Sequence, residues 1–242
     1  TVDNASLYPS GTVIEYLDEV IDEDGYYKYA VEGGFLHIDL GTGTVVYADD
    51  TVTGAVIPDE IQGKEIRTIA QNAFNGNIRV TYVTMDYITI IDSSAFSGCT
   101  NLSTVSMQSV TSLGMNAFNR CTSLTSVDLP SATTIGTYAL RYCSNLQTVN
   151  LPVAKTIGNA AFGDCISLVS VDLPEVTNIV SWAFANCTGL ESVNMPKVTS
   201  IGSYVFYGDI ALKTLDLPES LTSIGSYSVY NNPDLETVYI RN

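Results

Sequence analysis

The sequence predicts an α/β repeat solenoid, a curved right-handed coil with one parallel β-sheet, turns or short helices on the opposite face, and an N-terminal β cap. Five cysteines follow one another at intervals of 22 residues, and an apolar residue stands three places before each of them. A short alternating segment that ends in proline follows four of the five. A constant period over many copies identifies stacked repeats. The cysteines are Cys99, Cys121, Cys143, Cys165 and Cys187.

Each repeat contains one segment of period-2 alternation, such as Ser126–Pro130. Alternation of this kind predicts a strand with Val and Leu inward and Ser and Asp outward, which the proline ends. We expect the following Thr-Ile-Gly to form a turn, and the Ala-Phe pair to enter the core from the opposite side. A three-sheet parallel β-helix is the alternative fold, and it requires more than one alternating segment per coil. The core positions are Phe74, Phe96, Phe118, Leu140, Phe162, Phe184, Phe206 and Val229.

The cysteine column is predicted to be a ladder of buried free thiols, because cysteine packs as a small hydrophobe. Stacked residues have parallel Cβ vectors, which disfavour the near-90° torsion of a disulfide, and the odd count leaves one thiol over. A nucleophile would need a base, and the only histidine, His37, lies outside the repeats. No metal-ligand spacing is present. Polar residues replace cysteine at the ends of the column, as Asn77, Asp209 and Asn232.

The charge of the chain is strongly and unevenly acidic. The formal net charge is −16, and residues 1–65 hold 14 of the 26 acidic residues with only Lys28 and Lys64 as basic residues. An acidic chain without a basic stripe repels nucleic acid and anionic lipid, so we expect neither as a partner. No run of about 18 apolar residues is present, so membrane insertion is not expected.

Several stretches resemble the BspA-like leucine-rich repeat family, also called the Treponema pallidum type. The resemblance is carried by "IGNAAFGDCISLVSVDLPEVTNI" (157–179), "TIGTYALRYCSNLQTVNLP" (134–152) and "SIGSYVFYGDIALKTLDLP" (200–218), and the entrance "AVIPDEIQGKEIRTIAQNAF" (55–74) is similar to a usual first repeat. It covers about residues 54–240. It implies a solenoid on secreted or cell-surface bacterial proteins that engage host proteins, other cells or polysaccharides. The copy at 77–91 departs by lacking Cys and Pro.

Three segments are expected along the chain. Residues 1–25 read as an acidic arm or linker, and residues 26–53, with a Gly-Thr-Gly turn, read as a β cap that includes His37. Residues 54–242 read as about eight repeats. A solenoid's first coil needs such a cap because it otherwise exposes apolar surface.

Two surfaces are candidates for a ligand. Aromatic residues gather in the C-terminal half, on the side opposite the predicted sheet, and Tyr and Trp are favoured at contact surfaces. These residues are Tyr138, Tyr142, Trp182, Tyr204, Tyr207, Tyr227 and Tyr230. The alternative surface is an outward column on the sheet that alternates carboxylates and amides. Its members are Asp128, Asn150, Asp172, Asn194 and Asp216.

The sequence favours a non-catalytic extracellular or cell-surface binding and adhesion module without cofactor or metal, its signal peptide having been removed. The expected partner is a host or neighbouring-cell protein, or a polysaccharide. The alternatives are a structural spacer without a ligand and, less favoured, a β-helix polysaccharide-active enzyme using the Asp column, beside which paired basic residues are absent. Self-association through the C-terminal end, "ETVYIRN" (236–242), is also expected because its strand offers unpaired backbone groups.

Overall fold

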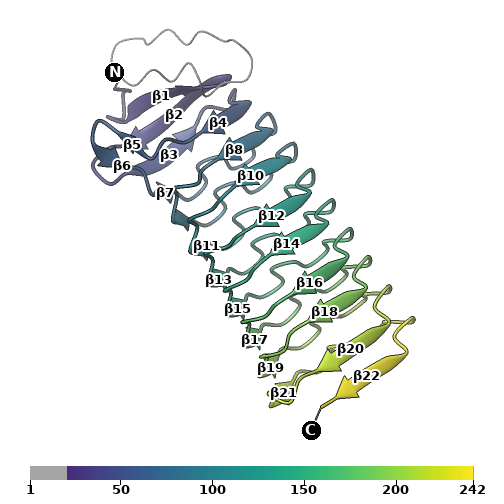
Figure 1. Ribbon diagram of the computed structural model, residues 1–242. Coiled ribbons are helices and arrows are strands. Elements are labelled where there is room, and N and C mark those ends of the chain that lie inside the picture. The colour runs from purple at the N-terminus through teal and green to yellow at the C-terminus, as the bar shows by residue number, and fades with distance from the viewer. Residues whose placement is uncertain (1–20, 242) are drawn as a thin grey trace.

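The computed structural model describes residues 21–241, so most of the predicted acidic arm lies outside the described residues. These residues form an elongated stack of coils with the β cap at one end (Figure 1). All regular elements in the described part of the chain are β-strands. Over residues 21–241 there is no apolar helix of membrane-spanning length.

The cap is an antiparallel meander that continues directly into the solenoid. It consists of β1 (Tyr27–Val31), β2 (Gly34–Asp39) and β3 (Thr44–Ala48). β3 then pairs in parallel with the first solenoid strand through Thr44↔Thr68 and Val45↔Ile69. A second small hairpin, β5 (Glu60–Ile61) with β6 (Lys64–Glu65), lies beside this junction. The cap therefore covers the apolar first coil, as a solenoid requires.

One array of parallel strands runs the full length of the stack. Together with the cap it makes an 11-stranded sheet. Its solenoid members have two residues each, and the second is a buried apolar residue in all of them except the last, where Ile224 is exposed. They are β7 (Thr68–Ile69), β9 (Ile90–Ile91), β11 (Ser112–Leu113), β13 (Thr134–Ile135), β15 (Thr156–Ile157), β17 (Asn178–Ile179), β19 (Ser200–Ile201) and β21 (Ser223–Ile224).

A second array carries the alternating segments predicted from the sequence. Its strands pair in parallel in smaller groups rather than as one continuous sheet. In β12 the register Ser126↔Thr148 and Asp128↔Asn150 places equivalent residues side by side. The members are β4 (Gly54–Val56), β8 (Tyr82–Thr84), β10 (Thr104–Ser106), β12 (Ser126–Asp128), β14 (Thr148–Asn150), β16 (Ser170–Asp172), β18 (Ser192–Asn194), β20 (Thr214–Leu217) and β22 (Thr237–Ile240).

The expectation of a single parallel sheet, with Thr-Ile-Gly as a turn, is therefore corrected. Thr-Ile forms the strands of the longer array, and each repeat contributes two strands. The sequence did not predict these strands because each has only two residues. A strand of that length is too short to show period-2 alternation in the sequence, although it is hydrogen-bonded to the neighbouring coils.

The short helices allowed for on the opposite face are also corrected, because residues 21–241 contain turns there. Two positions in each of these turns have positive φ. One lies two places before the core Phe, such as Asn116 (56°), and the other directly precedes the Cys, such as Arg120 (63°). A right-handed helix needs negative φ at every residue. Backbone N–H groups instead bind the next coil, as in Phe96 N–H to the Ala117 carbonyl at 2.8 Å.

The core is built from ladders of identical residues. Phe74, Phe96 and Phe118 stack at centroid spacings of 4.7 and 4.9 Å, and Phe162, Phe184 and Phe206 continue the ladder beyond Leu140. These spacings match the distance between neighbouring strands, about 4.8 Å. The core is therefore one continuous column through all coils.

The predicted ladder of buried thiols is confirmed. All five cysteines are free and buried, and each Sγ–H donates to the carbonyl of the residue 25 positions earlier at 3.0–3.2 Å. Burial raises the pKa of Cys99 and Cys143 to about 12, although a backbone N–H to each sulfur lowers it slightly. The thiolate, which is the reactive form, is therefore scarce at neutral pH.

We expect the folded protein to show little reaction with a thiol reagent at pH 8, and the chain in denaturant to show five reactive groups. Both burial and the raised pKa remove the thiolate in the native state. Time-resolved titration with a chromogenic disulfide reagent checks this. Fast labelling of one or more thiols under native conditions would contradict the buried ladder.

Candidate ligand-binding surfaces

The sheet-face column lies on the outward side of the second strand array, and its carboxylates already have partners. Asn150 Nδ2 donates to Asp128 Oδ1 at 2.7 Å, and Asn194 Nδ2 donates to Asp172 Oδ1 at 2.8 Å. The fifth member, Asp216, accepts from Arg241 Nε at 2.8 and 3.0 Å. The column is thus a row of amide–carboxylate pairs, which separates like charges along the face.

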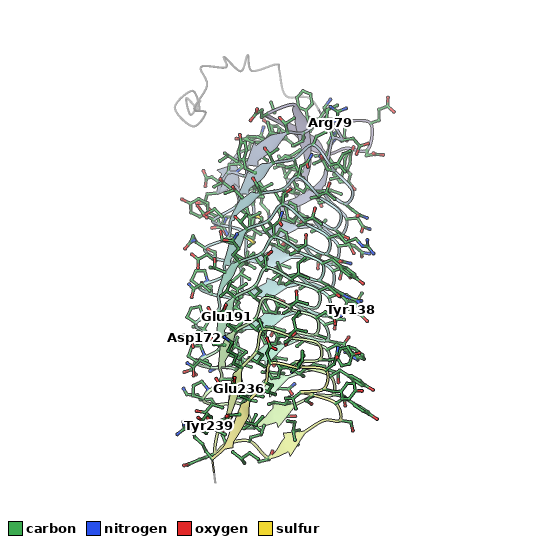
Figure 2. All side chains as sticks on the ribbon, turned by 90° about the vertical axis from the view of Figure 1, so that its right-hand side faces the viewer. Arg79, Tyr138, Asp172, Glu191, Glu236 and Tyr239 are labelled. Atoms are coloured by element: carbon green, nitrogen blue, oxygen red, sulfur yellow. The ribbon has the colours of Figure 1, made fainter. Side chains whose placement is uncertain are left out.

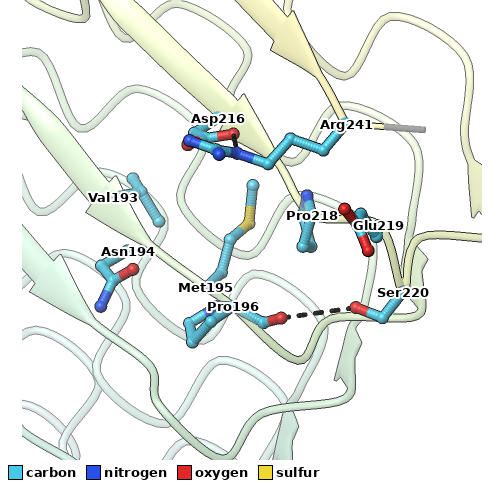
Figure 3. Close-up of a pocket in the computed structure, with 9 residues that line it drawn as sticks. All are labelled: Val193, Asn194, Met195, Pro196, Asp216, Pro218, Glu219, Ser220 and Arg241. Carbon is cyan, nitrogen blue, oxygen red and sulfur yellow. Dashed lines mark hydrogen bonds and ion pairs between the residues drawn. The ribbon is translucent and has the colours of Figure 1, made fainter.

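A pocket opens at the C-terminal end of this face, where the Asp216–Arg241 pair forms one wall (Figure 3). The hydrogen bond from Arg241 holds the pKa of Asp216 below its usual range. Ser220 Oγ donates to the Val198 carbonyl at 2.8 Å, so its hydroxyl is not held by a side-chain base. The pocket is lined by Val193, Asn194, Met195, Pro196, Asp216, Pro218, Glu219, Ser220 and Arg241.

The aromatic candidates all lie on the turn side of the coils; we call them together the aromatic face. Their first column occupies the left-handed backbone position two places before the core residue. The φ values are 57° at Tyr138, 64° at Trp182, 59° at Tyr204 and 60° at Tyr227. Bulky side chains rarely adopt this conformation. Figure 2 places Tyr138 and Asp172 on different sides of the solenoid, so the aromatic face and the sheet-face column are separate surfaces.

Five members of the aromatic face form one cluster near the C-terminal end. Trp182 stacks on Tyr204 at 4.1 Å, and Tyr204 stacks on Tyr227 at 5.1 Å. In the second column Tyr207 stacks on Tyr230 at 6.0 Å. The two columns meet edge to face at 5.8 and 5.6 Å within the coils of Tyr204 and Tyr227. Tyr204 is thus stacked on both faces, and each of the other four rings is stacked on one face.

The other two members, Tyr138 and Tyr142, form a separate group with two arginines. The Arg141 guanidinium lies 4.5 Å from the Tyr142 ring centre and 5.4 Å from that of Tyr138, and Arg120 lies 4.9 Å from Tyr142. Arg141 also donates through Nε to Asp164 at 3.2 Å. Neither arginine was among the residues predicted from the sequence. Their positions in the repeat are the signal that identifies them. Arg141 lies beside Tyr142 and three residues after Tyr138, and Arg120 lies one repeat of 22 residues before Tyr142.

The cap contains one buried polar cluster, and the predicted place of His37 in the cap is confirmed. His37 lies in β2, between Asp22, which contacts its Nδ1, and Asp49, whose Oδ1 is 2.9 Å from its Nε2. Although burial raises the pKa of Asp22, hydrogen bonds from His37, the Tyr26 N–H and Tyr47 hold it at about 2. Asp22 comes from the segment before β1, so the cluster ties that segment to the cap. Elsewhere too, residues 21–241 bring together no group of three or more His, Cys, Asp or Glu suited to a metal ion.

A family model described as the BspA type leucine rich repeat region, with six copies, matches residues 56–154 and 133–242. The solved structure of a T. pallidum leucine-rich repeat protein is 26% identical, with a TM-score of 0.59 over 92% of this chain and 91% of that one. A leucine-rich repeat protein from Bacteroides ovatus is 24% identical, with a TM-score of 0.58 over 93% and 66%.

A third structure, a leucine-rich repeat protein from Eubacterium ventriosum, is 18% identical, with a TM-score of 0.56 over 91% of this chain. The chain spans 66% of the B. ovatus protein and 52% of the E. ventriosum protein. No curated protein matches the chain.

Proposed function

This chain belongs to the BspA-type leucine-rich repeat family, and on that premise we propose that it is a non-catalytic binding module whose ligand surface is the aromatic face. The partner is a protein outside the cell, on a host or a neighbouring cell. The observation that carries the proposal is the placement of large aromatic side chains at left-handed backbone positions in the C-terminal coils.

The backbone does not require aromatic residues at these positions. Asn72, Ser94 and Asn116 hold the equivalent positions in earlier coils with φ of 56–62°. Asn is among the residues that tolerate this conformation best, whereas a left-handed aromatic residue costs roughly 1–2 kcal/mol. A stacked ring pair returns about 0.5–1.5 kcal/mol. Stability alone therefore gives little net reason for the aromatic side chains, which supports a role in contact.

The exposure of the rings supports the same role. Tyr227 and Tyr230 are 56% and 59% exposed, and Trp182 is 39% exposed. Exposed aromatic residues that cluster on one face are typical anchors of protein interfaces. With Arg120 and Arg141, the surface contains the three residue types most enriched among interface anchors, Tyr, Trp and Arg.

The orientation of the rings favours a protein over a polysaccharide. A sugar ring binds an aromatic side chain by lying on its face, and here both faces of the central ring, Tyr204, are covered, by Trp182 at 4.1 Å and by Tyr227 at 5.1 Å. At Tyr204 a ligand therefore meets the ring edge and the phenolic hydroxyl, which combine apolar and hydrogen-bonding contacts. On the sheet face, by contrast, the carboxylates of Asp128 and Asp172 already accept hydrogen bonds from neighbouring amides.

The extracellular placement and the absence of catalysis are part of the proposal. Buried thiols with raised pKa are compatible with an oxidising environment, because they do not react readily. In the described residues the pocket on the sheet face brings together no nucleophile and base, since Ser220 is bonded to a main-chain carbonyl. An ion pair occupies its only cationic lining residue, Arg241.

We expect Tyr227→Asn with Tyr230→Ser to weaken partner binding at least tenfold while changing the free energy of unfolding by about 1 kcal/mol or less. Removing exposed interface anchors costs affinity of roughly this size, and Asn relieves the left-handed backbone at 227. The wild type and the variant are compared on a printed array of extracellular proteins and neutral and acidic polysaccharides, followed by titration of each protein bound.

The matched control is Asp128→Asn with Asp172→Asn, which alters the sheet-face column and leaves the aromatic face intact. We expect this control to bind as the wild type does. Loss of binding in the control with full binding in the aromatic variant would transfer the site to the sheet face. Binding of polysaccharides alone, unaffected by either pair, would contradict a protein-binding aromatic face, and binding of nothing would favour the structural spacer.

A further inference from the structure

The inner column of the solenoid obeys one hydrogen-bonding rule. The side chain in each coil donates to the main-chain carbonyl of the core residue one coil back. The thiols do so at 3.0–3.2 Å. The two asparagines of the column do so through Nδ2, from Asn77 to the Val52 carbonyl at 3.3 Å and from Asn232 to the Phe206 carbonyl at 2.8 Å.

Asp209 is the member of this column whose side chain has no donor when it is ionised. It is fully buried, and its Oδ1 accepts from the Cys187 N–H at 2.8 Å. Its Oδ2 has no hydrogen-bond partner among the described residues. An unpaired buried carboxylate oxygen is costly, and buried polar atoms in native proteins are nearly always bonded.

We propose that Asp209 is held as a neutral carboxylic acid whose Oδ2–H donates to the Phe184 carbonyl, and that this proton makes the order of the C-terminal coils dependent on pH. Phe184 is 25 positions earlier, the offset used by all five thiols. A proton restores the donor that every other member of the column possesses. The Cys187 thiol of the preceding coil interacts electrostatically with Asp209, and the Asn232 amide oxygen of the following coil accepts the Asp209 N–H.

The electrostatic surroundings agree with a neutral group. In the described residues no lysine, arginine or histidine forms an ion pair with Asp209, while eight such contacts occur elsewhere. Burial raises the pKa of Asp209 to about 9, although the Cys187 N–H lowers it in part. A buried carboxyl without a cation normally takes a proton rather than a charge.

Asp209 lies next to the coils that carry the aromatic face. It follows Tyr207 by two residues, and its N–H donates to Asn232 Oδ1 at 2.8 Å in the coil that carries Tyr227 and Tyr230. Ionisation would place an unpaired charge between the coil of Tyr207 and the preceding coil, which carries Trp182 and Cys187. Loss of the proton at alkaline pH would then loosen the aromatic face. The effect of this on binding rests on the proposed function, but the protonation of Asp209 itself is independent of that function.

The direction of the pH effect follows from the two pKa values. The pKa is 3.8 in the unfolded chain and about 9 in the folded protein, so between them the folded state holds a proton that the unfolded state lacks. Stability from this group is present at low pH and is lost as pH rises from about 4 to about 9. The unfolding constant should increase about tenfold per pH unit across this range.

The test uses Asp209→Asn, which supplies the donor as Asn77 and Asn232 do and does not titrate. Denaturant unfolding is followed by the fluorescence of Trp182, the only tryptophan, which stacks on Tyr204. We expect the ratio of unfolding constants, wild type over variant, to rise about tenfold per pH unit between pH 5 and pH 8. The matched control is the exposed Asp234→Asn, which likewise replaces one carboxyl by an amide and should give a constant ratio.

A ratio for Asp209→Asn that stays constant from pH 5 to pH 8 would overturn the proposal. Should that variant not fold, the wild type decides the question through the ¹³C resonance of the Asp209 carboxyl carbon. Its chemical shift should remain that of a protonated acid up to pH 8, and titration near pH 4 would overturn the proposal. No partner is needed for either measurement, so failure of the aromatic variants to affect binding leaves this result independent.

Discussion

Phe96→Ala is expected to lower the free energy of unfolding by about 3–5 kcal/mol, the usual cost of removing a buried phenylalanine ring. Phe96 is fully buried, and its ring is stacked on both sides, at 4.7 Å on Phe74 and at 4.9 Å on Phe118. A cavity at this point interrupts a column that the backbone hydrogen bonds hold at a fixed spacing, so the neighbouring coils cannot collapse to fill it.

The chain itself supplies the control for this experiment. Leu140 occupies the same column and is fully buried, so Phe96→Leu should fold and cost less than about 1.5 kcal/mol. Denaturant unfolding of both variants, followed by circular dichroism, measures the difference. Equal losses for Ala and Leu would contradict a tightly packed ring ladder.

Truncation after Pro174 is expected to yield a fragment that is poorly soluble and does not unfold cooperatively. The cut removes the coil that contains Phe184, Cys187 and Leu190, all fully buried. The new terminal coil then exposes Phe162 and its neighbours. Repeats in a solenoid are stabilised by contacts with adjacent repeats, so such a fragment loses both stability and a covered end.

Size-exclusion chromatography and a thermal melt of residues 1–174 check this second prediction. Wild-type protein at the same concentration is the reference. A monodisperse fragment with a sharp, reversible melt would contradict the view that the coils form one continuous core.

The sequence predicted the repeat and its core because these features recur in every copy, and it predicted the cap because the first coil of a solenoid otherwise exposes apolar surface. The 22-residue interval of the cysteines identifies stacking, and the alternation at Ser126–Pro130 identifies β12 and its equivalents. The longer array was missed because strands such as Thr134–Ile135 have only two residues. Their hydrogen bonds join coils that are distant in sequence, and no local pattern reports such bonds.

The turns show a different limit of sequence reasoning. The sequence predicts Tyr204 and Tyr207 on the side opposite the sheet, and their rings meet there at 5.8 Å. It also allows a short helix on that side, which the left-handed conformation at Tyr204 excludes. Asn and Ser at the equivalent positions of earlier coils are compatible with a left-handed conformation, but aromatic residues rarely adopt it and so do not indicate it. The role of Asp209 likewise becomes visible only when its carboxyl is placed in the hydrogen-bonding register of the column.

The most direct test of the proposed binding surface is hydroxyl-radical footprinting of tyrosine side chains, with and without a protein bound on the array. Four tyrosines have nearly equal exposure: Tyr227 and Tyr230, at 56% and 59%, lie on the aromatic face, and Tyr87 and Tyr239, at 53% and 54%, lie outside it. We predict that the bound protein protects Tyr227 and Tyr230 from oxidation and leaves Tyr87 and Tyr239 unchanged. Protection of Tyr239 with continued oxidation of Tyr227 and Tyr230 would contradict the aromatic face as the ligand surface.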